Sequence, residues 1–157
     1  MMQLESMYQQ IILDHYKHPQ GKGLREPFLS EVHHVNPTCG DEITLRVDGS
    51  EAAGFHISYE NQGCSISQAS ASIMFELIDG KPYAQAMEVA DAFMQMMQSQ
   101  GAGEPNEELL EDASAFHGVA KFPARVKCAL LGWMAYKDAA SAAIARAHAA
   151  GREEGQR

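Results

Sequence analysis

The sequence predicts an α+β fold in which a small three-stranded antiparallel sheet carries helices packed on one face. Helical periodicity flanks a central segment, residues 31–60, whose own pattern is that of strands. A chain of 157 residues, 45% of them hydrophobic, is also the size of one domain with an ordinary core. We expect a single domain over residues 1–149 and a disordered tail over residues 150–157.

The first half of the chain supplies one helix and the strands. Residues 3–17 place apolar side chains at three- and four-residue steps, which predicts an amphipathic helix that the stretch HPQGKG then ends. Within residues 31–60, Phe55, Ile57 and Tyr59 alternate with more polar neighbours. This length fits a three-stranded meander.

The second half of the chain is expected to be helical. Gly80 is a common type of helix stop, Pro123 suits a first helical turn, and the stretch QGAGEPNEE between them resembles a loop. The predicted helices cover residues 66–79, about 82–98, a short segment ending near 115, and a long Ala-rich segment from Pro123 to about 149.

The charge balance excludes some classes of partner. Twelve basic against 21 acidic residues give a formal charge of −9, whereas a nucleic-acid binder needs a basic face. The N-terminus lacks the basic start and continuous apolar core of a secretory signal, and no apolar run is long enough to cross a bilayer. We therefore expect a soluble cytoplasmic protein without nucleic-acid or membrane partners.

The chain contains three cysteines, Cys39, Cys64 and Cys128. Their odd number and long spacings argue against a disulfide framework. In a reducing compartment such thiols are buried apolar groups, metal ligands or reactive nucleophiles.

Cys39 and Asp41 form a pair separated only by Gly40. In an extended backbone their side chains would point to the same face, and Gly40 alternatively permits a tight turn. A thiolate and a carboxylate together suit zinc. The alternative is that Asp41 only caps a turn.

Cys64 is predicted to lie at or just before a helix N-terminus, where Ser65 or Ser67 can cap the helix. Free amides and the helix dipole favour a thiolate at such a position. The alternative is a cysteine packed under the first turn, and this context alone does not decide between the two.

Cys128 falls in the second turn of the helix that begins at Pro123. Lys121, Arg125 and Lys127 are close in sequence, and nearby cations lower the pKa of a thiol. A cysteine on an Ala- and Leu-rich helix is, however, more often a core residue than a ligand.

Three cysteines and Asp41 would make a closed set of four metal ligands, but they come from segments 25 and 64 positions apart. Spacing alone therefore leaves buried or unrelated cysteines as the alternative. A nucleophilic cysteine with a histidine base is a further alternative, although no hydrolase signature surrounds any of the cysteines. The candidate bases are His33, His34, His56 and His117.

Four stretches in register, DHYKHPQGKG, NPTCGD, GCSISQASAS and KFPARVKCALLGW, resemble the SufU family of the IscU-like (NifU N-terminal) superfamily of iron–sulfur cluster assembly proteins. The resemblance covers about residues 5–136. It implies a SufE/NifU-like, IscU-like fold and a zinc site made of Cys39, Asp41, Cys64 and Cys128.

Two branches of the superfamily are separated by residues near the last cysteine. The scaffold branch, which holds a [2Fe–2S] cluster, has a histidine directly before that cysteine, where this chain has Lys127. It also has a shorter stretch before that cysteine and a chaperone-binding motif that residues 122–127 only partly resemble. These departures favour the SufU branch, and the [2Fe–2S] scaffold remains the alternative.

The resemblance implies a sulfur shuttle. A SufS-type cysteine desulfurase, which uses pyridoxal phosphate, would pass persulfide sulfur to Cys39 and be stimulated by this chain. Downstream Suf assembly proteins are further expected partners. Transfer would require Cys39 to leave the zinc, and Arg125 is a candidate contact with the desulfurase. A third hypothesis is an interaction module in which zinc only contributes folding energy.

Overall fold

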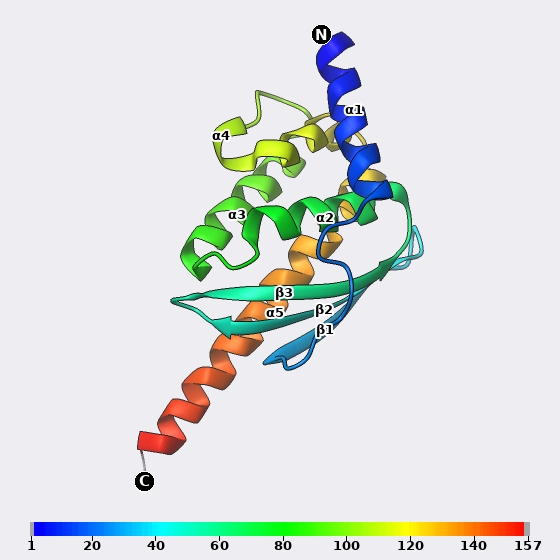
Figure 1. The fold of residues 1–157 in the computed structure, drawn as a ribbon. Coiled ribbons are helices and arrows are strands. Elements are labelled where there is room, and N and C mark those ends of the chain that lie inside the picture. Colours follow the sequence, from blue (N-terminus) through cyan, green and yellow to red (C-terminus); the bar gives the residue numbers. More distant parts are fainter. Residues whose placement is uncertain (1, 156–157) are drawn as a thin grey trace.

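The structure, a computed structural model, describes the backbone of residues 2–155 and the side chains of residues 5–151. Three strands follow the first helix, and the remaining elements are helical (Figure 1). In chain order they are α1 (Met2–Lys17), β1 (Ser30–Asn36), β2 (Asp41–Ser50), β3 (Gly54–Gln62), α2 (Ser65–Ile78), α3 (Tyr83–Gln98), α4 (Glu107–Leu110), the 3-10 helices η1 (Glu111–His117) and η2 (Val119–Lys121), and α5 (Pro123–Gly155).

The strands form an antiparallel meander in the order β1-β2-β3. Leu45 of the central strand lies opposite Val32 of β1 and Tyr59 of β3. Alternate side chains of β2, from Asp41 to Val47, are buried because they face the helices, as the period of a strand requires. The predicted three-stranded sheet is confirmed.

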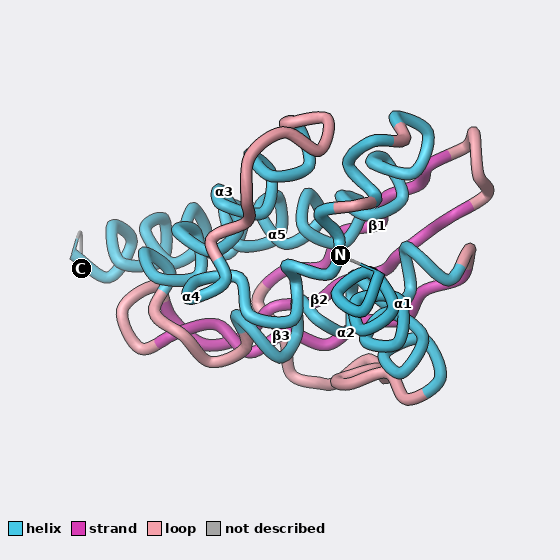
Figure 2. The backbone as a smooth tube through the Cα atoms, turned by 90° about the horizontal axis from the view of Figure 1, so that it is seen from above, coloured by secondary structure: helices cyan, strands magenta, loops and turns pink. Residues whose placement is uncertain are grey.

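The helices cover one face of this sheet (Figure 1). α5 packs across β1 and β2, α2 packs against α5, and α1 packs on α2. Seen from above, α3 and α5 run side by side (Figure 2). Trp133 of α5 stacks on Phe93 of α3 with ring centroids 4.4 Å apart, and its indole N–H donates to Ser70 Oγ of α2. The core therefore lies between the sheet and the helices, and the predicted α+β class is confirmed.

Two helical segments differ from the sequence-based expectation in their extent. The short helix expected to end near 115 is instead α4 followed by η1 and η2, which continue to Lys121. α5 extends to Gly155 rather than to about 149, because its Ala-rich end favours helix, and neither Gly132 nor Gly151 inside it interrupts the helix. Residues 156 and 157 lie outside the described part. The expectation of a single domain with a disordered tail over 150–157 stays a prediction.

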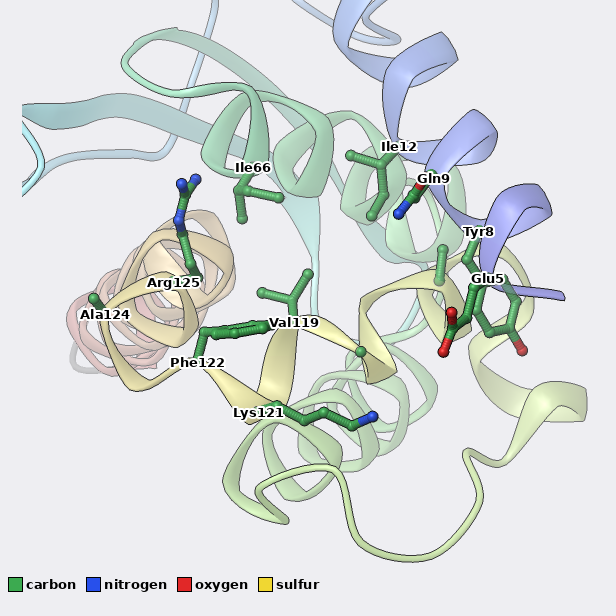
Figure 3. A pocket seen from close by; sticks show the side chains of 12 residues that line it. Glu5, Tyr8, Gln9, Ile12, Ile66, Val119, Lys121, Phe122, Ala124 and Arg125 are labelled. Carbon is green, nitrogen blue, oxygen red and sulfur yellow. The ribbon is translucent and has the colours of Figure 1, made fainter. Parts of the chain in front are cut away.

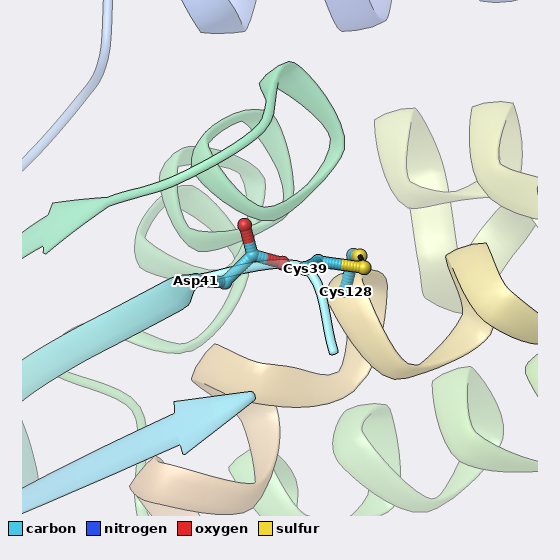
Figure 4. A group of neighbouring side chains, drawn as sticks. All are labelled: Cys39, Asp41 and Cys128. Carbon is cyan, nitrogen blue, oxygen red and sulfur yellow. Dashed lines mark hydrogen bonds between the residues drawn. The ribbon is translucent and has the colours of Figure 1, made fainter. Parts of the chain in front are cut away.

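Three connections between elements meet at one end of the sheet, where the strands end. The register pairs Asn36 with Asp41 and Glu42 with Gln62, so the turn between β1 and β2 lies beside the connection from β3 to α2. The first turns of α5 reach the same end of the sheet, as Figure 4 shows. Within residues 2–155, no helix is both long and apolar enough to span a membrane.

Candidate metal centre

Cys39 and Asp41 are brought together by a turn. Cys39 lies in the connection between β1 and β2, and Gly40 takes a φ of +70°, a left-handed conformation that glycine adopts without steric cost. The extended geometry considered for this pair is therefore wrong, and the alternative of a tight turn is correct. Cys39 is exposed, whereas Asp41, the first residue of β2, is fully buried.

The buried carboxylate of Asp41 is fixed by the next junction of the chain. Its Oδ1 accepts a hydrogen bond of 2.8 Å from the backbone N–H of Cys64. Gly63 has a φ of +142°, and a Cβ atom at this position would overlap Asp41 Oδ1. Only glycine therefore allows this close approach. Asp41 does more than cap a turn, because its carboxylate links the start of β2 to the start of α2.

Cys64 is itself the N-cap residue of α2, with an extended backbone and no side-chain cap. The expectation that Ser65 or Ser67 caps this helix is wrong, because the Ser67 hydroxyl instead donates to the Cys64 carbonyl at 3.0 Å. The Cys64 Sγ lies 3.8 Å from Asp41 Oδ2 and is half-buried. The prediction that Cys64 stands at a helix start is confirmed.

Cys128 lies in the second turn of α5, as predicted, and only 1% of its surface is exposed. Its Sγ lies 3.2 Å from Cys39 Sγ and 3.8 Å from the amide nitrogen of Asn36, and all three cysteines are free thiols. Asn36 was not singled out from the sequence, although it begins the quoted NPTCGD stretch.

Burial raises the pKa of Cys128, and hydrogen bonding to Asp41, Cys39 and Cys64 raises it further. The expectation that nearby cations lower this pKa is wrong. Lys121, Arg125 and Lys127 are all exposed on the outside of the chain, so their charges are solvated while the thiol is not. Without a metal ion, Cys128 is held as a neutral thiol.

These residues converge on one point. The ligand atoms of Cys39, Asp41 and Cys128 all lie within 4.8 Å of one another, and Figure 4 shows the two sulfurs side by side. The Cys64 sulfur contacts Asp41 but is not within 4.8 Å of all three of these atoms. We call Cys39, Asp41, Cys64 and Cys128 the thiol centre.

The donor set of the thiol centre fits zinc. With Zn–S near 2.3 Å and Zn–O near 2.1 Å, a tetrahedral shell separates two sulfurs by about 3.8 Å and a sulfur from an oxygen by about 3.6 Å. The 3.8 Å between Cys64 and Asp41 lies close to the sulfur–oxygen value. The 3.2 Å between Cys39 and Cys128 is shorter than the sulfur–sulfur value, so these two sulfurs would have to separate slightly around the ion. A four-ligand shell needs the Cys64 sulfur to move nearer to the trio.

The four histidines considered as candidate general bases make no contact with the cysteines among the hydrogen bonds of the described residues. His33 is 2.8 Å from Thr44 Oγ1 and His34 is 3.0 Å from Asp138 Oδ2. His56 pairs with Asp79, and His117 Nε2 is buried without a hydrogen-bond partner. Among the described side chains, no hydrogen bond joins a histidine to a cysteine. The structure gives no support to a cysteine–histidine nucleophile.

A groove of about 680 Å³ is lined by residues close in sequence to Cys64 and Cys128, and Figure 3 shows its lining. Ile66 lines it two residues after Cys64, and Phe122 and Arg125 line it just before Cys128. Phe122 is 59% exposed. Tyr8 of α1 lies at the opposite end of the groove in Figure 3. The groove thus offers apolar surface and positive charge on residues close in sequence to the thiols.

Comparison with known sequences gives consistent matches. The model of the NifU-like N-terminal domain matches residues 7–129. The chain is 42% identical to the zinc-dependent sulfurtransferase SufU of Bacillus subtilis, over 84% of this chain and 88% of that protein. It is 39% identical to the iron–sulfur cluster assembly scaffold protein IscU of Streptococcus pyogenes, over 87% of this chain and 84% of the relative.

Solved structures agree with these matches. A protein of Fervidobacterium islandicum, described as an iron–sulfur cluster assembly scaffold for the SUF system, is 32% identical and superposes with a TM-score of 0.76 over 87% of this chain and 98% of its own. The N-terminal part of a NifU-like protein from Brucella abortus, at 21% identity and a TM-score of 0.78, covers 88% of this chain and 95% of its own and shares the fold. The resemblance predicted from the four motifs is confirmed, and the chain belongs to the NifU-like N-terminal domain family, in which its sequence is of the SufU type.

Proposed function

We propose that this chain is a zinc-dependent sulfur carrier that accepts persulfide sulfur from a SufS-type cysteine desulfurase, stimulates that enzyme, and supplies iron–sulfur cluster assembly. The proposal is carried by one observation, the graded exposure of the thiols that meet at Asp41. Cys39 is exposed, Cys64 is half-buried and Cys128 is buried. One thiol of the centre can therefore meet a partner while the others stay covered.

Zinc would be held by Cys39, Asp41, Cys64 and Cys128. When bound, the ion supplies the positive charge that keeps the coordinating thiols deprotonated at neutral pH. The protein holds Asp41 ready for this role, because the Cys64 N–H donates to one carboxylate oxygen and leaves the other free to face sulfur. In its absence the buried Cys128 keeps its proton.

Sulfur transfer would proceed at Cys39. Its thiolate attacks the outer sulfur of the partner's cysteine persulfide, a new S–S bond forms on Cys39, and the S–S bond of the partner breaks. The partner cysteine leaves as a thiolate, and the outer sulfur keeps its proton. No change of metal redox state is needed. Cys39 is suited to this step because it lies in an exposed turn.

The groove lined by residues close in sequence to Cys64 and Cys128 supports docking of the desulfurase at this face (Figure 3). Exposed Phe122 and Arg125 combine an apolar anchor with a fixed positive charge, two features that binding surfaces favour. Although the chain as a whole is acidic, with a formal charge of −9, Arg125 and the exposed Lys121 both line this groove and offer positive charges to a carboxylate of the partner.

The test compares the unsubstituted chain with Cys39→Ala. Metal analysis after extensive dialysis should give one tightly bound zinc per chain in the unsubstituted protein. Cys39→Ala should lose all stimulation of the desulfurase while circular dichroism and a cysteine-independent stability measurement show an intact fold. A folded, zinc-bound Cys39→Ala protein that still stimulates fully would overturn the assignment of Cys39.

A [2Fe–2S] scaffold is the second candidate function, because two of the similar proteins are described as assembly scaffolds and three thiols also suit a cluster. Lys127, which replaces the histidine of the scaffold branch, counts against it. Anaerobic reconstitution with iron and sulfide separates the two. A stable cluster that displaces zinc and moves to an apo-acceptor would favour the scaffold.

A further inference from the structure

A second group of metal-ligating side chains lies away from the thiol centre, between α1, α2 and η1. His15 of α1, Glu76 of α2 and Asp112 of η1 each offer one ligand atom, and these three atoms lie within 4.8 Å of one another. We call these residues the imidazole cluster. The three elements that supply it pack against each other, so the cluster sits at their common junction.

His15 is buried and its ring is held in one orientation. Only 8% of the residue is exposed, and Nδ1 lies 2.7 Å from the hydroxyl oxygen of Ser72. Ser72 Oγ also accepts the backbone N–H of Gln20 at 2.8 Å. When Nδ1 carries the proton and donates it to Ser72, the lone pair of Nε2 points between the two carboxylates. This is the arrangement in which proteins orient histidines that bind metal ions.

The distances at Nε2 are too long for ordinary hydrogen bonds and suit a bridging ion. Nε2 lies 3.5 Å from Asp112 Oδ2 and 3.6 Å from Glu76 Oε2, whereas an N–H···O bond spans about 2.7–3.2 Å. A tetrahedral zinc with bonds near 2.1 Å separates its nitrogen and oxygen ligands by about 3.4 Å. The two distances from Nε2 thus match the ligand separations of a tetrahedral zinc, and all three atoms lie within 4.8 Å of one another.

The charge balance of the cluster also favours binding of a cation. Among the described side chains, His15 is the only basic group within ion-pair distance of Glu76 or Asp112. With a neutral imidazole the cluster carries two negative charges that no lysine or arginine offsets. The carboxylates are 45% and 52% exposed, so an ion can enter from solvent and keep a water molecule as its fourth ligand.

We propose that His15, Glu76 and Asp112 bind a second zinc ion, independent of the thiol centre, which joins α1 to α2 and η1. This site lacks thiolates and keeps half-exposed carboxylates, so it binds zinc more weakly than the thiol centre does. Its role is to fix the position of α1, the helix whose Tyr8 lines the far end of the groove. Zinc at this site therefore shapes the docking face without touching the thiols.

The experiment starts from the full chain with one equivalent of zinc already in the thiol centre. Zinc is then titrated while the imidazole nitrogens are followed by NMR and uptake is measured by isothermal calorimetry. A second equivalent should bind, and the His15 Nε2 resonance should shift while the other histidines stay unchanged. The melting temperature should rise with added zinc, because the ion binds only the folded arrangement.

The matched variants are Glu76→Gln with Asp112→Asn, and Asp138→Asn as a control. Asp138 pairs with His34 on the surface at 3.0 Å, so its replacement removes a histidine–carboxylate contact outside the cluster. We expect the double variant to bind the second zinc at least about tenfold more weakly, and Ser72→Ala about tenfold more weakly. The control should bind normally.

Two results would overturn the proposal. The first is zinc uptake that stops at one equivalent in the unsubstituted chain with no change at His15. The second is a folded double variant that takes up the second zinc as well as Asp138→Asn does, which would place that ion on other residues.

Discussion

The thiol centre and the imidazole cluster both join distant segments, but they are built from different parts of the fold. The thiol centre lies where turns and helix starts meet at one end of the sheet, and its three thiols range from exposed to buried. The imidazole cluster lies between packed helical elements, with a buried imidazole facing exposed carboxylates. In the functions we propose, Cys39 of the first arrangement can react with a partner, whereas the second only holds helices together.

The largest expected effect is at Asp41, the residue that connects the thiol centre to the sheet. Asp41→Asn keeps an oxygen that can accept the Cys64 N–H but loses the charge, and Asp41→Ala loses both. We expect zinc affinity at the thiol centre to fall about 100-fold or more in both variants. Asp41→Ala should also lower the free energy of unfolding of the zinc-free protein by about 2 kcal/mol, because a buried N–H is left unpaired.

Chelator competition and urea unfolding measure these two effects separately. Glu76→Gln, from the imidazole cluster, is the control and should leave the first equivalent of zinc untouched. Zinc affinity that survives intact in Asp41→Ala would remove Asp41 from the ligand set.

The next effect distinguishes Gly40 and Gly63, the glycines directly before Asp41 and Cys64. A Cβ at Gly63 would overlap Asp41 Oδ1, whereas a Cβ at Gly40 meets no atom within 4 Å although φ is +70°. Gly63→Ala should therefore weaken zinc binding about tenfold or more. Gly40→Ala should cost only about 1–2 kcal/mol of stability through its left-handed backbone. Equal zinc affinities in the two variants would show that Asp41 can move without consequence.

A smaller effect is expected on the docking face. Arg125 lines the groove, while Lys127 is another exposed cation of α5, outside the groove. Arg125→Ala should raise the concentration needed for half-maximal desulfurase stimulation about fivefold, equivalent to about 1 kcal/mol. Lys127→Ala is the matched control and should change it less than twofold. The same shift in both variants would mean that only net charge matters.

The smallest effect is expected in the imidazole cluster without metal. Glu76 is 45% exposed and faces His15 at 3.6 Å, so Glu76→Gln in zinc-free protein should change the free energy of unfolding by about 0.5 kcal/mol or less. Denaturant titration in the presence of chelator measures this. A loss of several kcal/mol would identify the cluster as an ion pair that stabilises the protein without any metal.

Periodicity was sufficient to predict the sheet and the long helices. Phe55, Ile57 and Tyr59 alternate as a half-buried strand must, and all three are buried. The end of α5 was harder to predict, because an Ala-rich sequence favours helix but does not indicate where the helix stops. The segment from Glu107 to Lys121 breaks into short helical pieces that tertiary packing decides.

The candidate site was only partly predictable from the residues. The motif around Cys39 and Asp41 indicated half of a metal site, but the approach of Cys64 and Cys128 depends on tertiary contacts across 25 and 64 positions. The raised pKa of Cys128 was mispredicted, because sequence neighbours reveal nearby charge but not burial. The roles of Asn36 and Gly63 follow from side-chain positions that no local pattern specifies.

The most direct test of the central claim is intact-protein and peptide mass spectrometry of the zinc-bound chain during turnover with a SufS-type desulfurase and L-cysteine. The account predicts one added sulfur atom, located on Cys39 and absent from the more buried Cys64 and Cys128, and no added sulfur in Cys39→Ala. Desulfurase stimulation without a persulfide on Cys39, or with the persulfide on another cysteine, would contradict it.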